Sequence, residues 1–251
     1  MKTIIVTQAR VGSTRLPGKV LKTIQGESML GIHLKRLKRA KNADAVMVAT
    51  TTEDGSDQII KIAESCESLF FQGSLEDVLD RFYQSVSPFS PDWVVRVTSD
   101  CPLIDSSLVD HVISEAQQGD FDYCANIITE DFPDGQDVEV FKFSALTKAW
   151  KDAKPQSDRE HVTPYIRNNS DLKGGSLFKA KDVQSEKSYN KIRMTVDEPA
   201  DFEMIQWLIN QLGTDKSWQE YVSYMLQHPE KLVNADILRN EGYLKSIIKD
   251  N

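Results

Sequence analysis

The first side chains that could do chemistry lie in a basic loop near the start of the sequence. Residues 8–19 read QARVGSTRLPGK and hold three cations, two glycines and two hydroxyls. Cations neutralise the charge of phosphate oxygens, glycines let backbone N–H groups approach those oxygens closely, and hydroxyls donate hydrogen bonds to them. A solvated basic turn is the ordinary alternative. Because the loop follows a hydrophobic stretch in an acidic chain, we favour a polyphosphate site with Arg10, Arg15 and Lys19 as its cations.

Two common phosphate-binding motifs do not fit this loop. A P-loop places four residues between its first glycine and a Gly-Lys pair, and a Ser or Thr follows the lysine. Here five residues separate Gly12 from Gly18, and a valine follows the lysine. A dinucleotide fingerprint needs three glycines in G-x-G-x-x-G spacing, and only Gly12 lies where the first two should be. The loop therefore belongs to neither class.

A second signal follows the hydrophobic stretch 93–97. Asp100 lies just after it, next to Ser99, and Pro102 restrains the turn. Mg²⁺ prefers few carboxylates and completes its coordination with water and phosphate oxygens. Asp100 is therefore a candidate magnesium ligand, although by residue type alone it could instead start a turn or cap a helix over 106–117.

The pattern of apolar residues predicts the elements that hold these groups. Short buried strands alternate with amphipathic helices in units of about thirty residues. Such alternation implies an α/β fold with a mostly parallel (mixed) sheet and helices on both faces. Ligands bind beyond the carboxyl ends of the strands in these sheets, so the basic loop and Asp100 should share one site. The predicted strands are 3–7, 45–50, 69–71, 93–97, 137–141 and 191–196, with another ending at 123–126, and the predicted helices are 29–37, 57–65, 73–83, 106–117, 144–153, one from 199 and a helical tail over 217–249.

Composition and charge narrow the class of protein. A chain of 251 residues with 40% hydrophobic and 27% charged residues is typical of a globular protein and long enough for one large domain. Its net charge of −8 argues against binding to nucleic acid or to anionic membranes. Three widely spaced cysteines indicate neither a disulfide framework nor a zinc motif. Because we find no signal peptide and no apolar run of membrane length, we expect a cytoplasmic protein.

The loop also resembles a known signature. The residues of 9–19, AR followed by STRLPGK, are similar to the signature loop of the sugar-acid cytidylyltransferases, which include 3-deoxy-manno-octulosonate and acylneuraminate cytidylyltransferases. The motifs SDCP at 99–102, GQDVEV at 135–140 and REHVTPY at 159–165 resemble the branch named after the spore coat polysaccharide biosynthesis protein SpsF. The resemblance implies a nucleotide-diphospho-sugar transferase-like fold and a nucleotidyltransferase.

The resemblance also implies Mg²⁺ as the cofactor. In the family, an acidic residue at the end of the strand that precedes Asp100 binds the metal. A second carboxylate comes from an Asp followed by a Pro and an acidic helix start, which matches Asp197. Without a partner site, Asp197 would most simply be a helix N-cap. We therefore expect Asp100 and Asp197 to converge on one sheet edge and to hold the metal.

The nucleotide is expected to lie over the loop, with cytosine selected by backbone groups around Gln8 and Ala9. Asp80 and Arg81 resemble the Asp-Arg pair of the octulosonate enzymes only loosely, because the surrounding Ser-Gly-Thr pattern is missing. That departure argues against octulosonate itself as the substrate. The predicted nucleotide-binding residues are Gln8, Ala9, Arg10, Gly12, Ser13, Thr14, Arg15, Lys19, Asp80, Arg81 and Ser99.

We expect one domain over 1–251, in which 123–190 forms an inserted lobe for the acceptor and for dimerisation. In the wider family this region lines the sugar-acid pocket. The ordinary alternative for the stretch around 159–161 is a solvated helix start. The residues predicted to bind the acceptor are Gln136, Asp137, Glu139, Arg159, His161 and Tyr165.

The expected reaction joins CTP to an acidic sugar, a nonulosonic acid or a related surface-polysaccharide precursor, and yields a CMP-sugar and pyrophosphate. The catalytic residues would be Arg10, Arg15, Lys19 and Asp100, and the protein would be a homodimer that binds neither nucleic acid nor membranes. One alternative is a glycosyltransferase that uses a nucleotide sugar. Another is a noncatalytic nucleotide-binding subunit of a polysaccharide pathway, but it would not need both Asp100 and Asp197.

Overall fold

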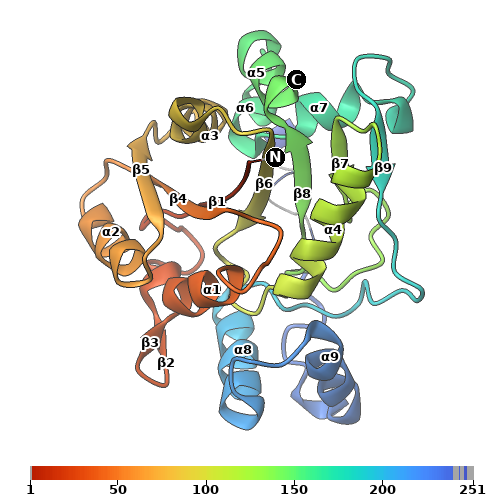
Figure 1. The fold of residues 1–251 in the computed structure, drawn as a ribbon. Helices are drawn as coiled ribbons and strands as arrows, with labels where there is room; N and C mark the ends of the chain where they lie inside the picture. Colours follow the sequence, from red (N-terminus) through yellow and green to blue (C-terminus); the bar gives the residue numbers. More distant parts are fainter. Residues whose placement is uncertain (1, 240–242, 244–245, 248–251) are drawn as a thin grey trace.

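One mixed sheet organises the molecule (Figure 1). The computed structural model describes residues 2–239, 243 and 246–247. The sheet has seven strands in the order β5-β4-β1-β6-β8-β7-β9, and β8 runs antiparallel to both of its neighbours while the other pairs are parallel. The strands are β1 (Thr3–Gln8), β4 (Ala45–Thr51), β5 (Leu69–Gly73), β6 (Trp93–Thr98), β7 (Tyr123–Ala125), β8 (Glu139–Lys142) and β9 (Ala180–Asp182), and a small hairpin is formed by β2 (Thr23–Ile24) and β3 (Glu27–Ser28).

Helices cover both faces of the sheet, and each layer has its own apolar core. The first face packs against α1 (Met29–Leu37), α2 (Ser56–Ser65), α4 (Ser106–Gln118), α8 (Pro199–Leu212) and α9 (Trp218–Gln227). The second packs against α3 (Val78–Val86), α5 (Phe143–Asp152), α6 (Gln156–His161) and α7 (Pro164–Asn168) (Figure 1). Short 3₁₀ turns are η1 (Lys19–Leu21), η2 (Ser87–Phe89), η3 (Asp171–Lys173) and η4 (Pro229–Lys231).

The central strands lie between these two layers of helices, and their continuous apolar sequences explain why both of their faces are buried. Residues 4–6 of β1 and 46–51 of β4 are buried without interruption. Strands covered on both faces show continuous apolar runs, whereas half-exposed strands alternate. The prediction of a mostly parallel sheet with helices on both faces is confirmed. The predicted lobe 123–190 supplies β7, β8 and β9 to this same sheet, and α5, α6 and α7 to its second face.

The predicted strand over 191–196 is wrong. This segment makes only an isolated bridge, between Asp134 and Arg193. Its backbone N–H groups go to different places: Met194 N donates to Asp134 O at 2.7 Å and Val196 N to Asp100 O at 2.8 Å. Residues 192–196 are buried and hydrogen-bonded to two loops, so burial rather than a strand ladder explains the strand-like pattern.

The predicted helical tail over 217–249 is also wrong in part. Helix α9 ends at Gln227, and 228–239 contain a 3₁₀ turn and irregular structure. Pro229 explains the end, because the residue before a proline is pushed out of the helical region. His228 accordingly has φ −130° and ψ 57°. Residues 240–242, 244–245 and 248–251 of the predicted tail lie outside the described ones.

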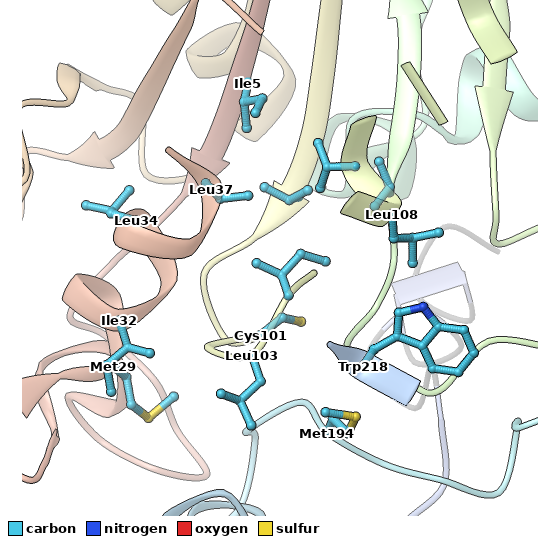
Figure 2. Packing of buried hydrophobic residues seen from close by; sticks show 14 of the residues in the cluster. Ile5, Met29, Ile32, Leu34, Leu37, Cys101, Leu103, Leu108, Met194 and Trp218 are labelled. Atoms are coloured by element: carbon cyan, nitrogen blue, oxygen red, sulfur yellow. The ribbon is translucent and has the colours of Figure 1, made fainter. Parts of the chain in front are cut away.

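The loop after β6 is anchored in the first core. Cys101 and Leu103 are 4% and 0% exposed and belong to the cluster that includes Met29 of α1 and Trp218 of α9. Figure 2 shows them between α1 and the segment that carries Met194. The buried side chains of Cys101 and Leu103 fix the course of this loop. Asp100, which directly precedes Cys101, is therefore held at the carboxyl edge of the sheet.

Candidate functional site

Lys19 joins three segments that are far apart in sequence. Its Nζ lies 2.9 Å from Asp100 Oδ2, 2.9 Å from Asp197 Oδ1 and 2.9 Å from the carbonyl oxygen of Val196. The three side chains are only 14%, 25% and 22% exposed in the order Lys19, Asp100, Asp197. The basic loop, the end of β6 and the segment before α8 therefore meet at one point on the carboxyl edge.

The charges at this point stabilise one another. Burial alone would raise the pKa of Asp100, but the charge and hydrogen bond of Lys19 outweigh it and hold that pKa well below its ordinary value. Burial likewise works against the ammonium of Lys19, yet Asp100 and Asp197 together leave the pKa of Lys19 raised. Lys19 and Asp100 are thus both charged over the whole neutral range.

The loop reaches this point through a tight turn before η1. Gly18 is the residue before the turn and has φ 64° and ψ 22°, a left-handed conformation that a glycine adopts without strain. Its N–H donates to the carbonyl of Val11 at 3.2 Å and closes the loop. Leu16 is only 7% exposed and fixes the loop to the first core. These contacts direct Lys19 inward.

Asp100 is held by its neighbours and by β1. Ser99, itself 5% exposed, donates from Oγ to the carbonyl of Gln8 at 2.6 Å. The carbonyl of Cys101 lies 2.9 Å from Nδ1 of His33, which must carry the proton because a carbonyl only accepts. Nε2 of the same ring is then an acceptor for the Thr7 hydroxyl at 3.0 Å. Helix α4 is capped by Asp105 and not by Asp100.

Asp197 is oriented by a buried arginine. Arg193 Nη2 lies 3.0 Å from Asp197 Oδ2, and the same guanidinium binds Asp201 and Asp134 at 2.8 and 2.5 Å. Helix α8 is capped by Glu198 in a capping box with Asp201, so Asp197 is not the N-cap. Both carboxylates that were predicted to converge do so, and neither serves the helix cap that was its alternative role.

The other cations of the loop are exposed. Arg15 is 38% exposed and lies 3.0 Å from Asp197 Oδ1 and 3.7 Å from Glu198 Oε1. Arg10 is exposed and has no hydrogen bond or ion pair among the described residues. The site thus presents two guanidinium groups to solvent beside the Lys19 bridge.

Arg81 of α3 lies behind Arg10. It is 2% exposed, and its Nη1 donates to the Ser74 carbonyl at 2.6 Å, while its Nε is buried and has no partner among the described residues. Burial, and next the positive charge of Arg10, lower the pKa of Arg81 to about 10. An anion between these two arginines would relieve their repulsion. Asp80 faces elsewhere, since its Oδ1 accepts from Trp150 Nε1 at 2.8 Å.

The remaining loop residues line the same edge. The Ala9 N–H donates to Ala49 O at 3.2 Å, and Ser13 Oγ accepts from the Leu16 N–H at 3.4 Å. Thr14 is exposed. A Cβ at Gly12 would come within 2.8 Å of a Glu53 carboxylate oxygen, so glycine permits a close approach there. The side-chain oxygen of Gln8 is buried and has no partner among the described residues.

Three predicted acceptor residues lie at or just before the start of β8, and each has a partner within the protein. Gln136 accepts from the Asp105 N–H and donates to the Leu103 carbonyl, both at 3.0 Å. Asp137 lies 2.6 Å from Arg239 Nη2. One carboxylate oxygen of Glu139 lies 2.6 Å from Arg96 Nη1, and the other lies 2.5 Å from the Tyr123 hydroxyl.

The other three lie around α6 and α7. Arg159 binds Asp77 Oδ2 through Nε at 2.7 Å and through Nη2 at 2.6 Å. His161 Nε2 lies 3.0 Å from Ser246 Oγ. The ring of Tyr165 packs edge-on against Phe178, with centroids 6.3 Å apart. The structure thus brings the loop, Asp100 and Asp197 together and spreads the six acceptor candidates over a wider region.

Sequence reasoning missed Arg96, Arg193 and His33. Two of them carried a signal, because a single arginine interrupts each of the apolar stretches WVVRVT and KIRMTV. A cation in such a stretch must find a partner or a ligand. His33 lies in a helical pattern with apolar neighbours and gave no such signal.

The residues present fit a divalent metal that is completed by its substrate. Among the described residues, no three His, Cys, Asp or Glu side chains are grouped to hold a metal on their own. Asp100 and Asp197 nevertheless lie close enough to contact one ammonium, so a cation is favoured between them. Two carboxylates with phosphate oxygens and water are a typical Mg²⁺ environment. None of the helices in the described ranges is long and apolar enough to span a membrane.

Two sequence relatives cover nearly the whole chain. An uncharacterized protein of Methanocaldococcus jannaschii is 40% identical over 249 residues, which are 97% of this chain and 98% of that protein. The spore coat polysaccharide biosynthesis protein SpsF of Bacillus subtilis is 30% identical over 238 residues, 90% of this chain and 95% of that protein.

Two solved structures share the fold. A cytidylyltransferase from Leptospira borgpetersenii superposes with a TM-score of 0.88 at 32% identity and covers 95% of this chain and 100% of its own. A CMP:2-keto-3-deoxy-manno-octonic acid synthetase complexed with CTP has a TM-score of 0.63 at 17% identity, over 84% and 99% of the two chains, and supports the fold alone. The family described as "Cytidylyltransferase" matches residues 4–227, and the chain belongs to this family.

Proposed function

We propose that this chain transfers a cytidylyl group from CTP to a hydroxyl of an acidic sugar and releases pyrophosphate. Membership of the cytidylyltransferase family supports nucleotidyl transfer. The observation that carries the proposal is the Lys19 bridge between Asp100 and Asp197, with Arg10 and Arg15 exposed beside it. The acidic sugar is the finer part of the proposal, and it rests on the resemblance of the loop to sugar-acid cytidylyltransferases.

The basic loop would hold the triphosphate. Attack of the acceptor hydroxyl on the α-phosphorus forms a P–O bond and releases the hydroxyl proton to solvent. The bond from the α-phosphorus to the oxygen that bridges to the β-phosphate breaks, and that oxygen leaves with the electron pair. Negative charge therefore grows on pyrophosphate, where fixed cations are most useful. Arg10 and Arg15 would bind its oxygens from the solvent side and Lys19 from below, and Ser13 and Thr14 would add hydroxyl donors.

Asp100 and Asp197 would hold Mg²⁺. When bound, the metal would neutralise phosphate charge and lower the pKa of the attacking hydroxyl. Both carboxylates already face the same cation, and Arg193 fixes the orientation of Asp197. Lys19 would then turn from the carboxylates towards phosphate.

Base recognition would use the end of β1. A buried Gln8 side-chain oxygen without a partner is costly, and the amino group of cytosine could satisfy it. Arg81, together with Ser99 and the backbone at Ala9 and Gly12, would complete the nucleotide site. Asp80 is already bonded to Trp150 and would act through the position of α3.

The stretch 123–190 would receive the acceptor and contribute to a homodimer, with the whole of 1–251 acting as one domain. It borders the carboxyl edge, because β8 runs antiparallel to β6 and therefore begins where β6 ends. Its candidate contacts stay Gln136, Asp137, Glu139, Arg159, His161 and Tyr165.

Pyrophosphate release tests the proposal. The protein is incubated with Mg²⁺, one nucleoside triphosphate and one member of a panel of acidic and neutral sugars. We expect release only with CTP and an acidic sugar, together with a CMP-sugar in the products. Consumption of UTP or GTP but not of CTP would overturn the cytidylyl assignment. Release that needs a preformed nucleotide sugar would indicate a glycosyltransferase.

Lys19→Met is the matched variant for this assay. It removes the fixed positive charge that would stabilise the leaving pyrophosphate, so turnover should fall about 100- to 1000-fold. Arg15→Lys separates fork geometry from charge, because a lysine cannot bind phosphate oxygens in a bidentate manner. If both variants released pyrophosphate at the wild-type rate, the loop would not be the phosphate site.

A further inference from the structure

A cationic cluster lies one step behind the carboxyl edge, on the second face of the sheet. Arg96 of β6 is paired directly across the antiparallel ladder with Glu139 of β8, and with Val6 of β1 on its other side. Val6 and its neighbours on this face are apolar and fully buried. Arg96 is thus a cation placed beside apolar strand residues, two residues before the end of β6.

Glu139 uses only part of the Arg96 guanidinium. Arg96 Nη1 lies 2.6 Å from Glu139 Oε1, and this is its one ion pair among the described residues. Its Nε is buried and has no hydrogen-bond partner there. Nε and Nη2 together form the second edge of the guanidinium, the edge that binds a carboxylate through two parallel hydrogen bonds. That edge has no hydrogen-bond partner among the described residues.

Glu139 itself is fully satisfied by the protein. Its Oε2 accepts from the Tyr123 hydroxyl at 2.5 Å, and Thr163 adds a further hydrogen bond. Arg167 lies near the same carboxylate and stacks on the Tyr243 ring at 5.2 Å. Two guanidinium groups therefore face one carboxylate.

The neutral members of the cluster do not cancel this excess. Burial keeps the Tyr123 hydroxyl protonated by raising its pKa. Burial, and next the nearby Arg96 and Arg167, lower the pKa of His161 to about 4, so the ring is uncharged at neutral pH. Arg96, Arg167 and Glu139 together carry one more positive than negative charge, and the nearby Asp137 is paired with Arg239, in a chain whose net charge is −8.

A strained turn holds the same cluster in shape. Val162 has φ 72° and ψ −57°, and the Thr163 N–H donates to the His161 carbonyl at 2.9 Å across it. This is a classic γ-turn, rare and strained, here at a buried β-branched residue. The turn places Thr163 beside Glu139 and His161 near the two arginines, and strain of this kind concentrates at binding sites.

We propose that the free edge of Arg96 binds the carboxylate of the acidic acceptor and so selects acidic over neutral sugars. This inference rests on the proposed function, because it assigns a group of that substrate to a place in the site. The acceptor would lie over β6 and β8, with its carboxylate at Arg96 and its attacking hydroxyl towards Asp100. Arg167 contributes long-range charge.

Arg96→Lys tests the assignment, because lysine keeps the charge that faces Glu139 and loses the two-bond edge. The KM for the best acidic acceptor should rise about 10- to 100-fold, as expected for hydrogen bonds to a charged group. The KM for CTP should stay within about twofold. A rise in the KM for CTP instead would overturn the proposal and assign the edge to phosphate. Arg39→Lys, on an exposed arginine paired with Asp215, is the control and should change neither constant.

The primary amide of the same acceptor sharpens the test. Wild-type protein should strongly prefer the acid to the amide, and Arg96→Lys should lose most of that preference. The paired variant Arg96→Met/Glu139→Gln removes both buried charges together and avoids an unpaired carboxylate. It should fold, as judged by its urea midpoint, and show the same loss of preference. A folded variant that still prefers the acid would contradict the assignment.

Side-chain NMR separates this inference from the proposed function. The Arg96 Nε–H resonance, identified by its absence in Arg96→Lys, should shift saturably with pyruvate or N-acetylneuraminate and not with chloride at equal ionic strength. If it shifts while no sugar is cytidylylated, the carboxylate site stands and the reaction is wrong. If an acidic sugar is cytidylylated while the resonance and the acceptor KM of Arg96→Lys do not respond, the reaction stands and the Arg96 assignment is wrong.

Discussion

The basic loop and the 123–190 stretch differ in what their polar side chains do. In the loop, Arg10 has no partner among the described residues and Arg15 is more than a third exposed. In the 123–190 stretch, Arg159 binds Asp77 and Glu139 binds Arg96. Both regions look equally polar in sequence. Among the side chains predicted for the site, Arg10 and Arg15 of the loop are exposed, whereas Arg159 and Glu139 of the 123–190 stretch are largely buried in ion pairs.

Whether a polar side chain has a partner within the protein separates binding groups from structural ones. A partly buried polar group whose hydrogen bonds are made within the protein contributes to stability, and its loss leaves the partner unsatisfied. A cation without a partner adds little to stability and gains an interaction only when a ligand arrives. Variants in the loop should therefore change catalysis, and variants in the 123–190 stretch should first change stability.

The largest expected effect is on turnover at the carboxylates. Asp100→Asn keeps the shape of the side chain and removes the charge that Lys19 and the metal would use. Turnover should fall about 100- to 1000-fold. Pyrophosphate release at saturating CTP measures it, with Asp215→Asn, an exposed carboxylate, as the control. Wild-type turnover in Asp100→Asn would remove Asp100 from the site.

Arg159→Met tests whether a side chain of the 123–190 stretch contributes mainly to stability. The guanidinium makes two contacts with Asp77 at the start of α3 and two more with backbone carbonyls. Its removal should lower the free energy of unfolding by about 1.5–3 kcal/mol, measured by urea titration. Turnover per folded molecule should change little. A raised acceptor KM in the folded variant would support the acceptor contact proposed for Arg159, and an unchanged urea midpoint would contradict its role in stability.

His33 gives a pH-dependent test of the buried support under Asp100. Burial lowers the pKa of His33 to about 4, whereas an unfolded histidine titrates near 6.5. Below pH 6.5 the unfolded chain takes up a proton that the folded chain refuses, so stability falls as the pH drops towards 4. This histidine alone should contribute about 2 kcal/mol to the loss between pH 7.5 and 5.

The variant His33→Gln should be less stable at pH 7.5 but should lose about 2 kcal/mol less on acidification. Urea titration at both pH values measures this. The exposed His111→Gln should follow the wild-type slope. Equal slopes for His33→Gln and wild type would mean that His33 is not held neutral.

Arg10→Ala has the smallest expected effect. Removal of one exposed cation should raise the KM for CTP about 10-fold, about 1.4 kcal/mol of binding. The urea midpoint should not move, because Arg10 has no partner to lose among the described residues. Lys61→Ala, an exposed cation on α2, is the control. A large drop in stability for Arg10→Ala would break the contrast between the two regions.

Most of the fold follows from the sequence because the central strands are buried on both faces. Continuous apolar runs such as 45–50 leave few alternatives to a parallel sheet between helices. The same pattern predicted a strand wrongly at 191–196, because a buried segment without a strand ladder can be as apolar as a strand. The end of α9 at Gln227 was readable from Pro229, and the pattern of aromatic residues obscured it.

The site was predictable where residue type limits the possible roles. A loop with three cations, followed by an Asp at a strand end, predicts one place on the sheet. Partners of residues such as Arg159 and His161 depend on tertiary contacts with Asp77 and Ser246, which no local pattern encodes. The Arg96 contact was open to prediction, since a cation inside an apolar strand needs a partner.

The Lys19 bridge also has a consequence for how activity appears during synthesis. Its two carboxylates lie 81 and 178 residues further along the chain. A nascent chain that ends before Asp197 can form β1, β4, β5 and β6 in order, yet it lacks one of the two anionic groups that position the lysine. At roughly 5–20 residues per second, the missing carboxylate follows Lys19 after about 10–40 s. Under the role proposed for Asp197, catalysis would start only after nearly the whole fold has been made.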